Sequence, residues 1–163
     1  MAVTLAVAIP TIGRPSLERT LKAIVGQGLI DGDEIWVVYD AGYPGSCHAM
    51  RDRLRARVES FGPHMRYLEY DHGCSFKGVF QSNVAFQRAT AEYVLAHSDD
   101  DVFTSGAFDH LRTLAAPDPQ RPILFRTISP AGHPTWPDGH PCLRRNKVGG
   151  GNLAAPRASL KPY

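Results

Sequence analysis

Cysteine is scarce in this sequence, and long apolar runs free of proline and charge are missing. Cys47, Cys74 and Cys142 are an odd number at wide spacing, which argues against a disulfide framework and for a reducing compartment. The apolar opening (residues 1–15) has no basic residue before it and is interrupted by Pro10, so it predicts a buried strand rather than a signal peptide or a membrane span. We therefore expect a cytoplasmic protein without a transmembrane segment.

Paired metal-ligand spacing and a strong charge excess are also absent. Each cysteine has a histidine within two residues, but none shows the paired spacing typical of structural zinc, so free thiols explain them better. The 18 Lys and Arg against 16 Asp and Glu give a formal net charge of +2, which is too small to indicate a general nucleic-acid binder. The basic run Arg144, Arg145 and Lys147 is explained more simply as solvated than as a diphosphate contact.

Strand-like and helix-like patterns alternate along the chain. Strands are expected at residues 3–10, 34–40, 65–70 and 93–98, which are short, apolar and rich in β-branched or aromatic residues. Between and after them, apolar residues recur every three or four positions, as on one face of a helix. The expected helical positions are Leu17, Leu21, Ile24 and Val25, then Cys47, Met50, Leu54, Val58 and Phe61, then a helix from about Phe80 to Glu92, then Phe108, Leu111, Leu114 and Ala115 with Thr104 and Ser105 as N-caps. Beyond these the pattern changes to strand-like pieces (122–128 and 133–136), turns, and a short helix at 155–160.

Four successive strand and helix units predict an α/β fold. We expect a single Rossmann-like domain with a mainly parallel, twisted sheet flanked by helices, right-handed crossovers, and a smaller irregular C-terminal part. Ligands of such sheets bind outside the carboxyl ends of the strands. Polar segments follow all four expected strands, at residues 10–14, Asp40, residues 71–78 and residues 98–101. One polar loop is unremarkable, but four at one edge predict a ligand site there.

The run Asp99, Asp100 and Asp101 places three negative charges side by side. Carboxylates about 6 Å apart repel by roughly 1 to 3 kcal/mol per pair, so a compensating partner is expected. Mg²⁺ and Mn²⁺ prefer hard oxygen ligands and complete their shell with waters and substrate phosphates, and such an ion acts as a Lewis acid on a phosphate leaving group. Two alternatives stay open: a helix cap with solvated neighbours, or structural calcium, although the alternating ligands and glycine of a common calcium loop are missing.

Three segments together, residues 7–24, 37–42 and 82–103, resemble the nucleotide-binding half of the family 2 glycosyltransferases, which have the A-type glycosyltransferase fold. The resemblance implies that the base and ribose of a nucleotide sugar lie against the first loop, the acid ending the second strand, the third helix and the aspartate motif. The implied nucleotide-binding residues are Pro10, Thr11, Arg14, Asp40, Asn83 and Asp99. The implied ligands of Mn²⁺ or Mg²⁺ are Asp99, Asp100 and Asp101.

Two motif positions depart from the family pattern. The usual Ala-Arg-Asn ahead of the third helix is Gln-Ser-Asn here, so Asn83 matches while Ser82 replaces the arginine, for which Lys77 or Arg88 would substitute. Ser98 stands where the first aspartate falls in one register of the motif. The assignment that we favour places Asp99 toward the ribose and shares the metal between the next two aspartates.

By this resemblance, the chain is a metal-dependent glycosyltransferase that moves a sugar from a nucleotide diphosphate sugar, UDP being the commonest, to an acceptor hydroxyl with inversion. The acceptor stays open among a glycan, a lipid carrier, a protein and a modified nucleic acid. Residues 1–163 form one glycosyltransferase domain in this interpretation. Residues 1–103 are its nucleotide-sugar-binding half, and residues 104–163 are its acceptor-side part, complete or truncated.

Inverting transfer needs a carboxylate within hydrogen-bond reach of the acceptor hydroxyl. Asp138 is the catalytic candidate, with His140 second, although a plain turn aspartate explains the Pro-Asp-Gly sequence more simply. A base beyond Tyr163 is the other reading, if the chain is a fragment. The alternative function is a catalytically silent nucleotide-sugar-binding module, and a nucleotidyltransferase is a weaker third because residues 10–16 match its glycine-rich basic loop poorly.

Overall fold

The computed structural model describes residues 2–44, 47–71, 78–124, 127–128, 134–136 and 153–160. Its helices are α1 (Ser16–Val25), α2 (His48–Glu59), α3 (Val79–Arg88), α4 (Ala107–Ala115) and the 3₁₀ segment η2 (Arg157–Ser159). Its strands are β1 (Leu5–Thr11), β2 (Glu34–Asp40), β3 (Met65–Tyr70), β4 (Tyr93–Ala96), β5 (Ile123–Leu124), β6 (Thr127–Ile128), β7 (Pro134–Trp136) and β8 (Leu153–Pro156). Within these described ranges, none of the helices combines the length and the apolar character that a membrane crossing requires.

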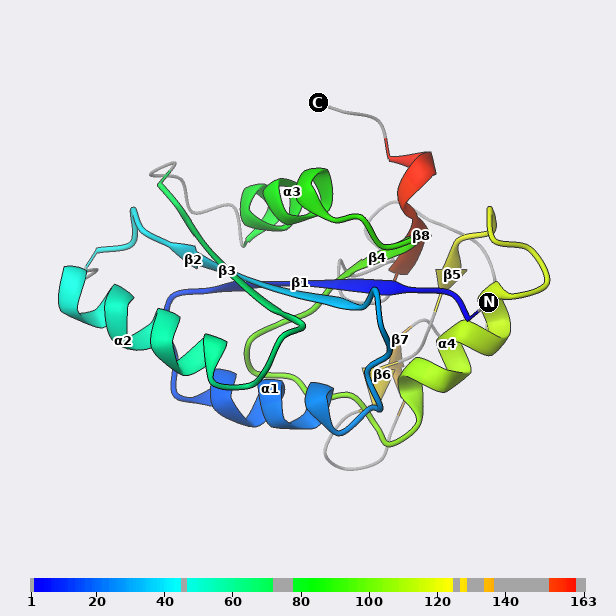
Figure 1. The fold of residues 1–163 in the computed structure, drawn as a ribbon, viewed down its shortest axis with the longest axis horizontal. Coiled ribbons are helices and arrows are strands. Elements are labelled where there is room, and N and C mark those ends of the chain that lie inside the picture. The colour runs from blue at the N-terminus through cyan, green and yellow to red at the C-terminus, as the bar shows by residue number, and fades with distance from the viewer. Residues whose placement is uncertain are drawn as a thin grey trace.

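Six strands form one sheet in the order β3-β2-β1-β4-β8-β5. The first four are parallel, as the alternating pattern predicts, and β8 runs antiparallel between β4 and β5. Strands β6 and β7 form a separate antiparallel pair. The sheet is twisted, so that β3 crosses β1 at an angle in Figure 1. The expected mainly parallel α/β architecture is confirmed.

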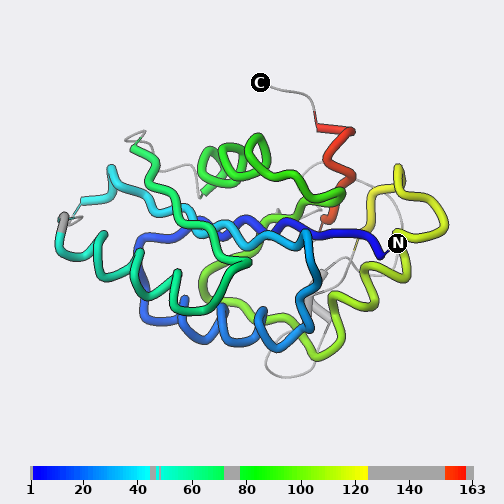
Figure 2. Tube along the Cα trace, in the orientation of Figure 1, coloured from blue at the N-terminus to red at the C-terminus, as the bar shows by residue number. Residues whose placement is uncertain are grey.

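Helices cover both faces of this sheet. Helices α1, α2 and α4 lie on one face and α3 lies on the other (Figure 1). Six of the seven β1 residues are buried, because this central parallel strand is covered on both sides. The path of the chain in Figure 2 shows α1, α2 and α3 running back against the strands that precede them, which places their N-termini at the carboxyl edge of the sheet.

The inward faces of α1 and α4 differ from expectation at one position each. Val25 and Leu114 are 41% and 42% exposed, because each lies about a quarter turn or more from the middle of its helix's buried face. Thr20 and Arg112 take inward positions instead and are buried. Polar groups at these positions require hydrogen-bond partners, and those of Thr20 lie in the candidate site.

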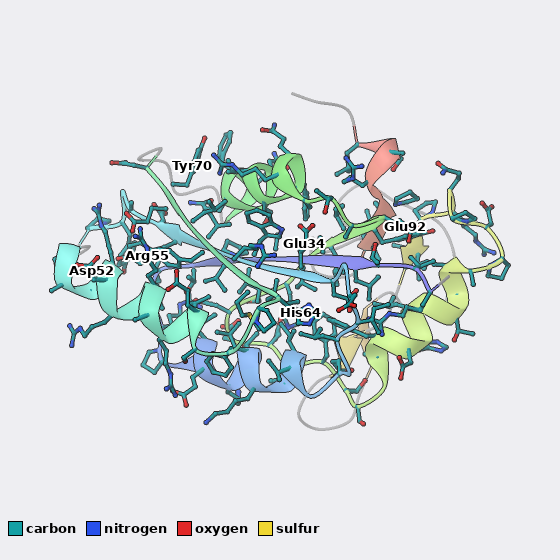
Figure 3. The ribbon with its side chains drawn as sticks, in the orientation of Figure 1. Glu34, Asp52, Arg55, His64, Tyr70 and Glu92 are labelled. Atoms are coloured by element: carbon teal, nitrogen blue, oxygen red, sulfur yellow. The ribbon has the colours of Figure 1, made fainter. Side chains whose placement is uncertain are left out.

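Helix α3 ends at Arg88, four residues before the expected Glu92. Ala89 has an extended backbone, and the Thr90 N–H donates to Glu34 Oε1 at 2.9 Å. Glu34 lies on the α3 side of the sheet (Figure 3), and its Oε2 accepts the Trp36 indole N–H at 2.6 Å. These contacts between distant segments end the helix.

Three smaller expectations are also wrong. The α4 N-cap is Gly106, in the left-handed region, and neither Thr104 nor Ser105 caps the helix with its side chain. Cys47 precedes α2 and is exposed rather than inward. Pro10 lies inside β1 rather than ending it, because β4 pairs with β1 only as far as Ala8 and leaves β1 one free side where a missing N–H is tolerated.

Candidate functional site

The sheet order reverses direction between β1 and β4. The chain passes from β1 through β2 to β3 on one side and then places β4 on the other side of β1. The crevice at the carboxyl ends of two strands that diverge in this way is where open α/β sheets bind their ligands. The segment between β1 and α1 (residues 12–15) and the aspartate loop, defined here as residues 97–103, both begin at this point.

Asp99 is the buried centre of this site. It is 4% exposed, and the Thr11 hydroxyl donates to its Oδ2 at 2.6 Å. The Gly13 N–H donates to Thr11 Oγ1 at 3.0 Å, which turns the hydroxyl hydrogen toward the carboxylate. Arg14 Nη1 lies 3.4 Å from the other oxygen, Oδ1. Both oxygens of Asp99 are therefore engaged, one by Thr11 at the end of β1 and the other by Arg14 in the segment that follows.

Asp100 and Asp101 are exposed and more loosely held. Asp100 Oδ2 pairs with Arg14 Nη1 at 3.2 Å, and its Oδ1 accepts the Ser98 hydroxyl. The side chains of this pair are each 50% exposed, so the pair contributes about 0 to 1 kcal/mol. No hydrogen bond or ion pair from the described residues reaches the Asp101 carboxylate. Arg14 thus supplies part of the charge compensation that the three aspartates need.

Helix α1 contacts the backbone of the same three aspartates. The Thr20 hydroxyl lies 2.7 Å from the Asp101 carbonyl oxygen and 3.2 Å from that of Asp99, and Arg19 Nη2 donates to the Asp100 carbonyl oxygen at 2.6 Å. Neither residue is among the site residues predicted from sequence. The only signal for Thr20 is a hydroxyl residue at helical spacing with Leu17, Leu21 and Ile24.

His97 and Phe103 close the aspartate loop at its two ends. Their rings stack with centroids 4.1 Å apart, and Phe103 meets Phe108 of α4 edge-on at 5.1 Å. Burial lowers the pKa of His97 below its ordinary 6.5, against the opposing effects of Asp101 and Asp100. The ring is therefore neutral at neutral pH. Its Nε2 is buried without a hydrogen-bond partner among the described residues.

The other predicted nucleotide-binding residues are not joined to this cluster by hydrogen bonds. Pro10 lies close to the N-terminus of α3. A Cβ built on Gly78, which precedes α3, would lie 2.4 Å from the Cγ of Pro10. Asp40 ends β2, and its carboxylate accepts the N–H of Gly42 at 3.1 Å. Asn83 is half-buried on α3.

Several other candidates are distant or undescribed. Arg88 ends α3, and a helix of this length places its backbone about 14 Å from the end beside Pro10. Lys77, Asp138 and His140 lie outside the described residues.

The donor chemistry of the loop fits Mn²⁺ or Mg²⁺. Asp100 and Asp101 offer exposed carboxylate oxygens, whereas Asp99 is committed to Thr11 and Arg14. Among the described residues, no group of three or more metal-binding side chains is arranged around a point. An ion of this kind needs only one or two protein carboxylates when substrate phosphates and waters complete its shell.

Comparisons with known proteins find similarity in structure and not in sequence. No protein-family model matches the chain, and no curated protein matches its sequence. Among solved structures, TarS residues 1–349 from S. aureus aligns with a TM-score of 0.70 at 14% identity, covering 96% of this chain and 48% of that one. Structures of TarS in complex with UDP and with UDP-GlcNAc also match, each with a TM-score of 0.60.

Two further structures have the same architecture. The mannosyltransferase PcManGT from Pyrobaculum calidifontis, in complex with GDP-Man and Mn²⁺, aligns with a TM-score of 0.66 at 21% identity, over 96% of this chain and 45% of that one. The 4-diphosphocytidyl-2C-methyl-D-erythritol synthase from Anaerococcus prevotii aligns with a TM-score of 0.55 at 17% identity, over 96% and 71%. The chain spans about half the length of the TarS and mannosyltransferase chains. It has the fold of the A-type glycosyltransferases and related nucleotide-sugar transferases.

Proposed function

We propose that this protein is a metal-dependent glycosyltransferase that takes a sugar from a nucleotide diphosphate sugar, UDP being the first candidate, and transfers it with inversion. One observation carries this function. Thr11 donates a hydrogen bond to Asp99, and Arg14 contacts Asp99 and Asp100, at the point where the sheet order reverses. The structural neighbours with bound UDP, UDP-GlcNAc or GDP-Man and Mn²⁺ support the donor class.

The residues take different roles in this function. Asp99, oriented by Thr11, accepts hydrogen bonds from the ribose, and Asp100 and Asp101 hold Mn²⁺ or Mg²⁺. The bound ion supplies neutralisation of the diphosphate leaving group. The Arg14 side chain is half-exposed, and in this function it exchanges its contacts with Asp99 and Asp100 for contacts with the nucleotide.

The remaining predicted residues complete the donor and acceptor sides. Pro10, Asp40 and Asn83 line the nucleotide within residues 1–103. Asp138 is the proposed general base on the acceptor side, residues 104–163.

The first test combines binding with turnover. We expect UDP or GDP with Mn²⁺ to raise the melting temperature by about 5 to 10 °C at 100 times its dissociation constant, and EDTA to abolish the shift. UDP-glucose, UDP-GlcNAc and GDP-mannose are then incubated with the protein and Mn²⁺, and release of UDP or GDP is measured. Asp99→Asn is expected to lose most of the shift, because the amide presents an N–H₂ where the carboxylate accepts hydrogen bonds.

The outcomes separate the competing functions. Release of nucleoside diphosphate supports transfer, whereas binding without release supports a silent nucleotide-sugar-binding module. Incorporation of a nucleoside monophosphate from CTP or UTP would indicate a nucleotidyltransferase, the activity named for one structural neighbour. No shift with any nucleotide, with or without Mn²⁺, would rule out the proposed donor site.

A further inference from the structure

All three consecutive backbone carbonyls of the aspartates lie within hydrogen-bond distance of side chains from one helix. The Thr20 hydroxyl has one hydrogen to donate and lies 2.7 Å from the carbonyl oxygen of Asp101 and 3.2 Å from that of Asp99, and Arg19 donates to that of Asp100. Loops normally leave carbonyls of this kind to solvent. Here side chains of α1 fix three successive peptide units, and with them the directions in which the three carboxylates leave the backbone.

Thr20 is placed where a hydroxyl is costly unless it is used. It is fully buried on the inward face of α1, between Leu17 and Ile24. A valine would fill the same volume without a polar group to satisfy. At this position a buried hydroxyl that contacts the aspartate loop takes the place of a purely apolar side chain. This is expected of a residue that serves the site.

A second contact holds the loop at its ends. His97 and Phe103 stack face to face, and Phe103 packs on the fully buried Phe108. The two ends of the loop, at β4 and near α4, are thus joined by one aromatic contact. Side chains of α1 contact the residues between these ends.

We propose that Thr20, Arg19 and the His97–Phe103 stack are positioning residues that hold the aspartate loop in the shape that binds a metal ion and a nucleoside diphosphate. They touch neither ligand and act through the backbone of Asp99, Asp100 and Asp101. This role rests on the proposed function, since it specifies how the donor site is held open in the free protein. Pre-organisation of this kind increases affinity because the loop need not be ordered on binding.

The test compares hydroxyl-removing and hydroxyl-keeping variants of one residue. Thr20→Val keeps the shape and removes the hydroxyl, whereas Thr20→Ser keeps the hydroxyl. Affinity for UDP with Mn²⁺ is measured by calorimetry, and hydrogen exchange of the backbone amides of residues 98–103 is measured without ligand. We expect Thr20→Val to weaken affinity about tenfold, the equivalent of one lost hydrogen bond, and to accelerate exchange in the loop, with Thr20→Ser restoring both.

A variant of the exposed Arg19 keeps the test valid if a substitution at the buried Thr20 disturbs folding. Arg19→Gln removes the bond to the Asp100 carbonyl from the surface of α1 and is expected to weaken affinity about threefold. Arg53→Gln is its matched control, because Arg53 is also exposed and also donates to a backbone carbonyl, that of Ala49 at 3.2 Å, outside the loop. Thr113→Val removes a hydroxyl that bonds the Asp109 carbonyl at 2.8 Å. Both controls should bind as the unaltered protein does.

The possible failures are distinguishable. If the unaltered protein binds neither UDP nor GDP with Mn²⁺, the proposed function is wrong and the ligand-directed role of these residues is wrong with it. If the unaltered protein binds and Thr20→Val binds equally well with unchanged loop exchange, only the positioning role is wrong. Equal losses in Thr20→Val and Thr20→Ser would also overturn it, because the hydroxyl would then not be the group that matters.

Discussion

Gly78 shows how one residue fixes the relation of α3 to the end of β1. Its φ of 77° lies in the left-handed region, and a Cβ built on it would lie 2.4 and 2.5 Å from Pro10 Cγ and Cβ. Gly106 has nearly the same φ, 75°, at the start of α4, but a Cβ there meets nothing within 4 Å. The two glycines therefore separate the cost of backbone conformation from the cost of close approach.

We expect Gly106→Ala to lower the free energy of unfolding by about 1 kcal/mol, the cost of a left-handed alanine. Gly78→Ala should cost about 2 to 4 kcal/mol, because the Pro10 ring or α3 must also move. Urea denaturation of both variants measures the difference. Equal losses would show that α3 and Pro10 adjust freely and that the approach is not tight.

The local pattern predicts where secondary structure exists better than where it ends. Strands β1 to β4 and helices α1 to α4 follow from periodicity alone. The end of α3 does not, because it depends on Thr90 binding Glu34, which is 56 residues away in sequence.

The candidate site also has a part that the sequence predicts and a part that it does not. The rule for carboxyl ends of strands brings Thr11, Arg14 and Asp99 to one edge, but Arg19 and Thr20 act on backbone carbonyls, which have no signature in the sequence.

The junction of α3, β2 and β4 depends on an ionised Glu34, so its contribution should vary with pH. Burial alone would raise the pKa of Glu34, but the hydrogen bonds from Thr90 and Trp36 outweigh it and lower the pKa below the ordinary 4.5. A carboxyl with a lowered pKa in the folded state stabilises that state above its unfolded pKa and loses this contribution as pH falls through the folded pKa.

We expect Glu34→Gln to lower the free energy of unfolding by about 1 to 3 kcal/mol at pH 7, and the difference from the unaltered protein to shrink as the pH falls below 4.5. Urea denaturation at a series of pH values measures both. Glu59→Gln, at the exposed end of α2, is the control and should not reproduce this change. A difference that stays constant down to the acid limit would mean that Glu34 is not ionised in the folded protein.

At the scale of the molecule, the proposed donor half shares its buried core with residues beyond 103. Phe108, Leu111, Ile123 and Ala154, all beyond residue 103, belong to the same buried cluster as the β1 residues. Strand β8 pairs with β4, and the Arg157 N–H donates to the Glu92 carbonyl at 2.8 Å. The division at residue 103 is therefore a proposed division of roles within one core.

A buried ion pair between Arg112 of α4 and Asp33 also joins the two halves. Asp33 is 2% exposed, and its Oδ1 accepts the N–H of Leu5 at 2.9 Å while Oδ2 pairs with the guanidinium of Arg112. Removing α4 leaves the Asp33 carboxylate without its cation, and breaking a buried pair from one side costs about 3 to 5 kcal/mol. Exposing the apolar face that Phe108 and Leu111 cover adds about 1.5 to 3 kcal/mol for each of these side chains. These losses together are comparable to the whole stability of an ordinary domain, about 5 to 15 kcal/mol.

A fragment of residues 1–103 should therefore fail to fold cooperatively, although it carries every proposed nucleotide and metal ligand. Circular dichroism and urea denaturation of the fragment, beside the chain of 163 residues, measure this. Replacing Asp33 by Asn in the fragment removes the charge penalty but not the lost apolar burial, so it should leave the fragment unfolded. A cooperative transition in the fragment, with retained binding of UDP and Mn²⁺, would show that α4 and β8 are additions to a self-sufficient donor domain rather than parts of its core.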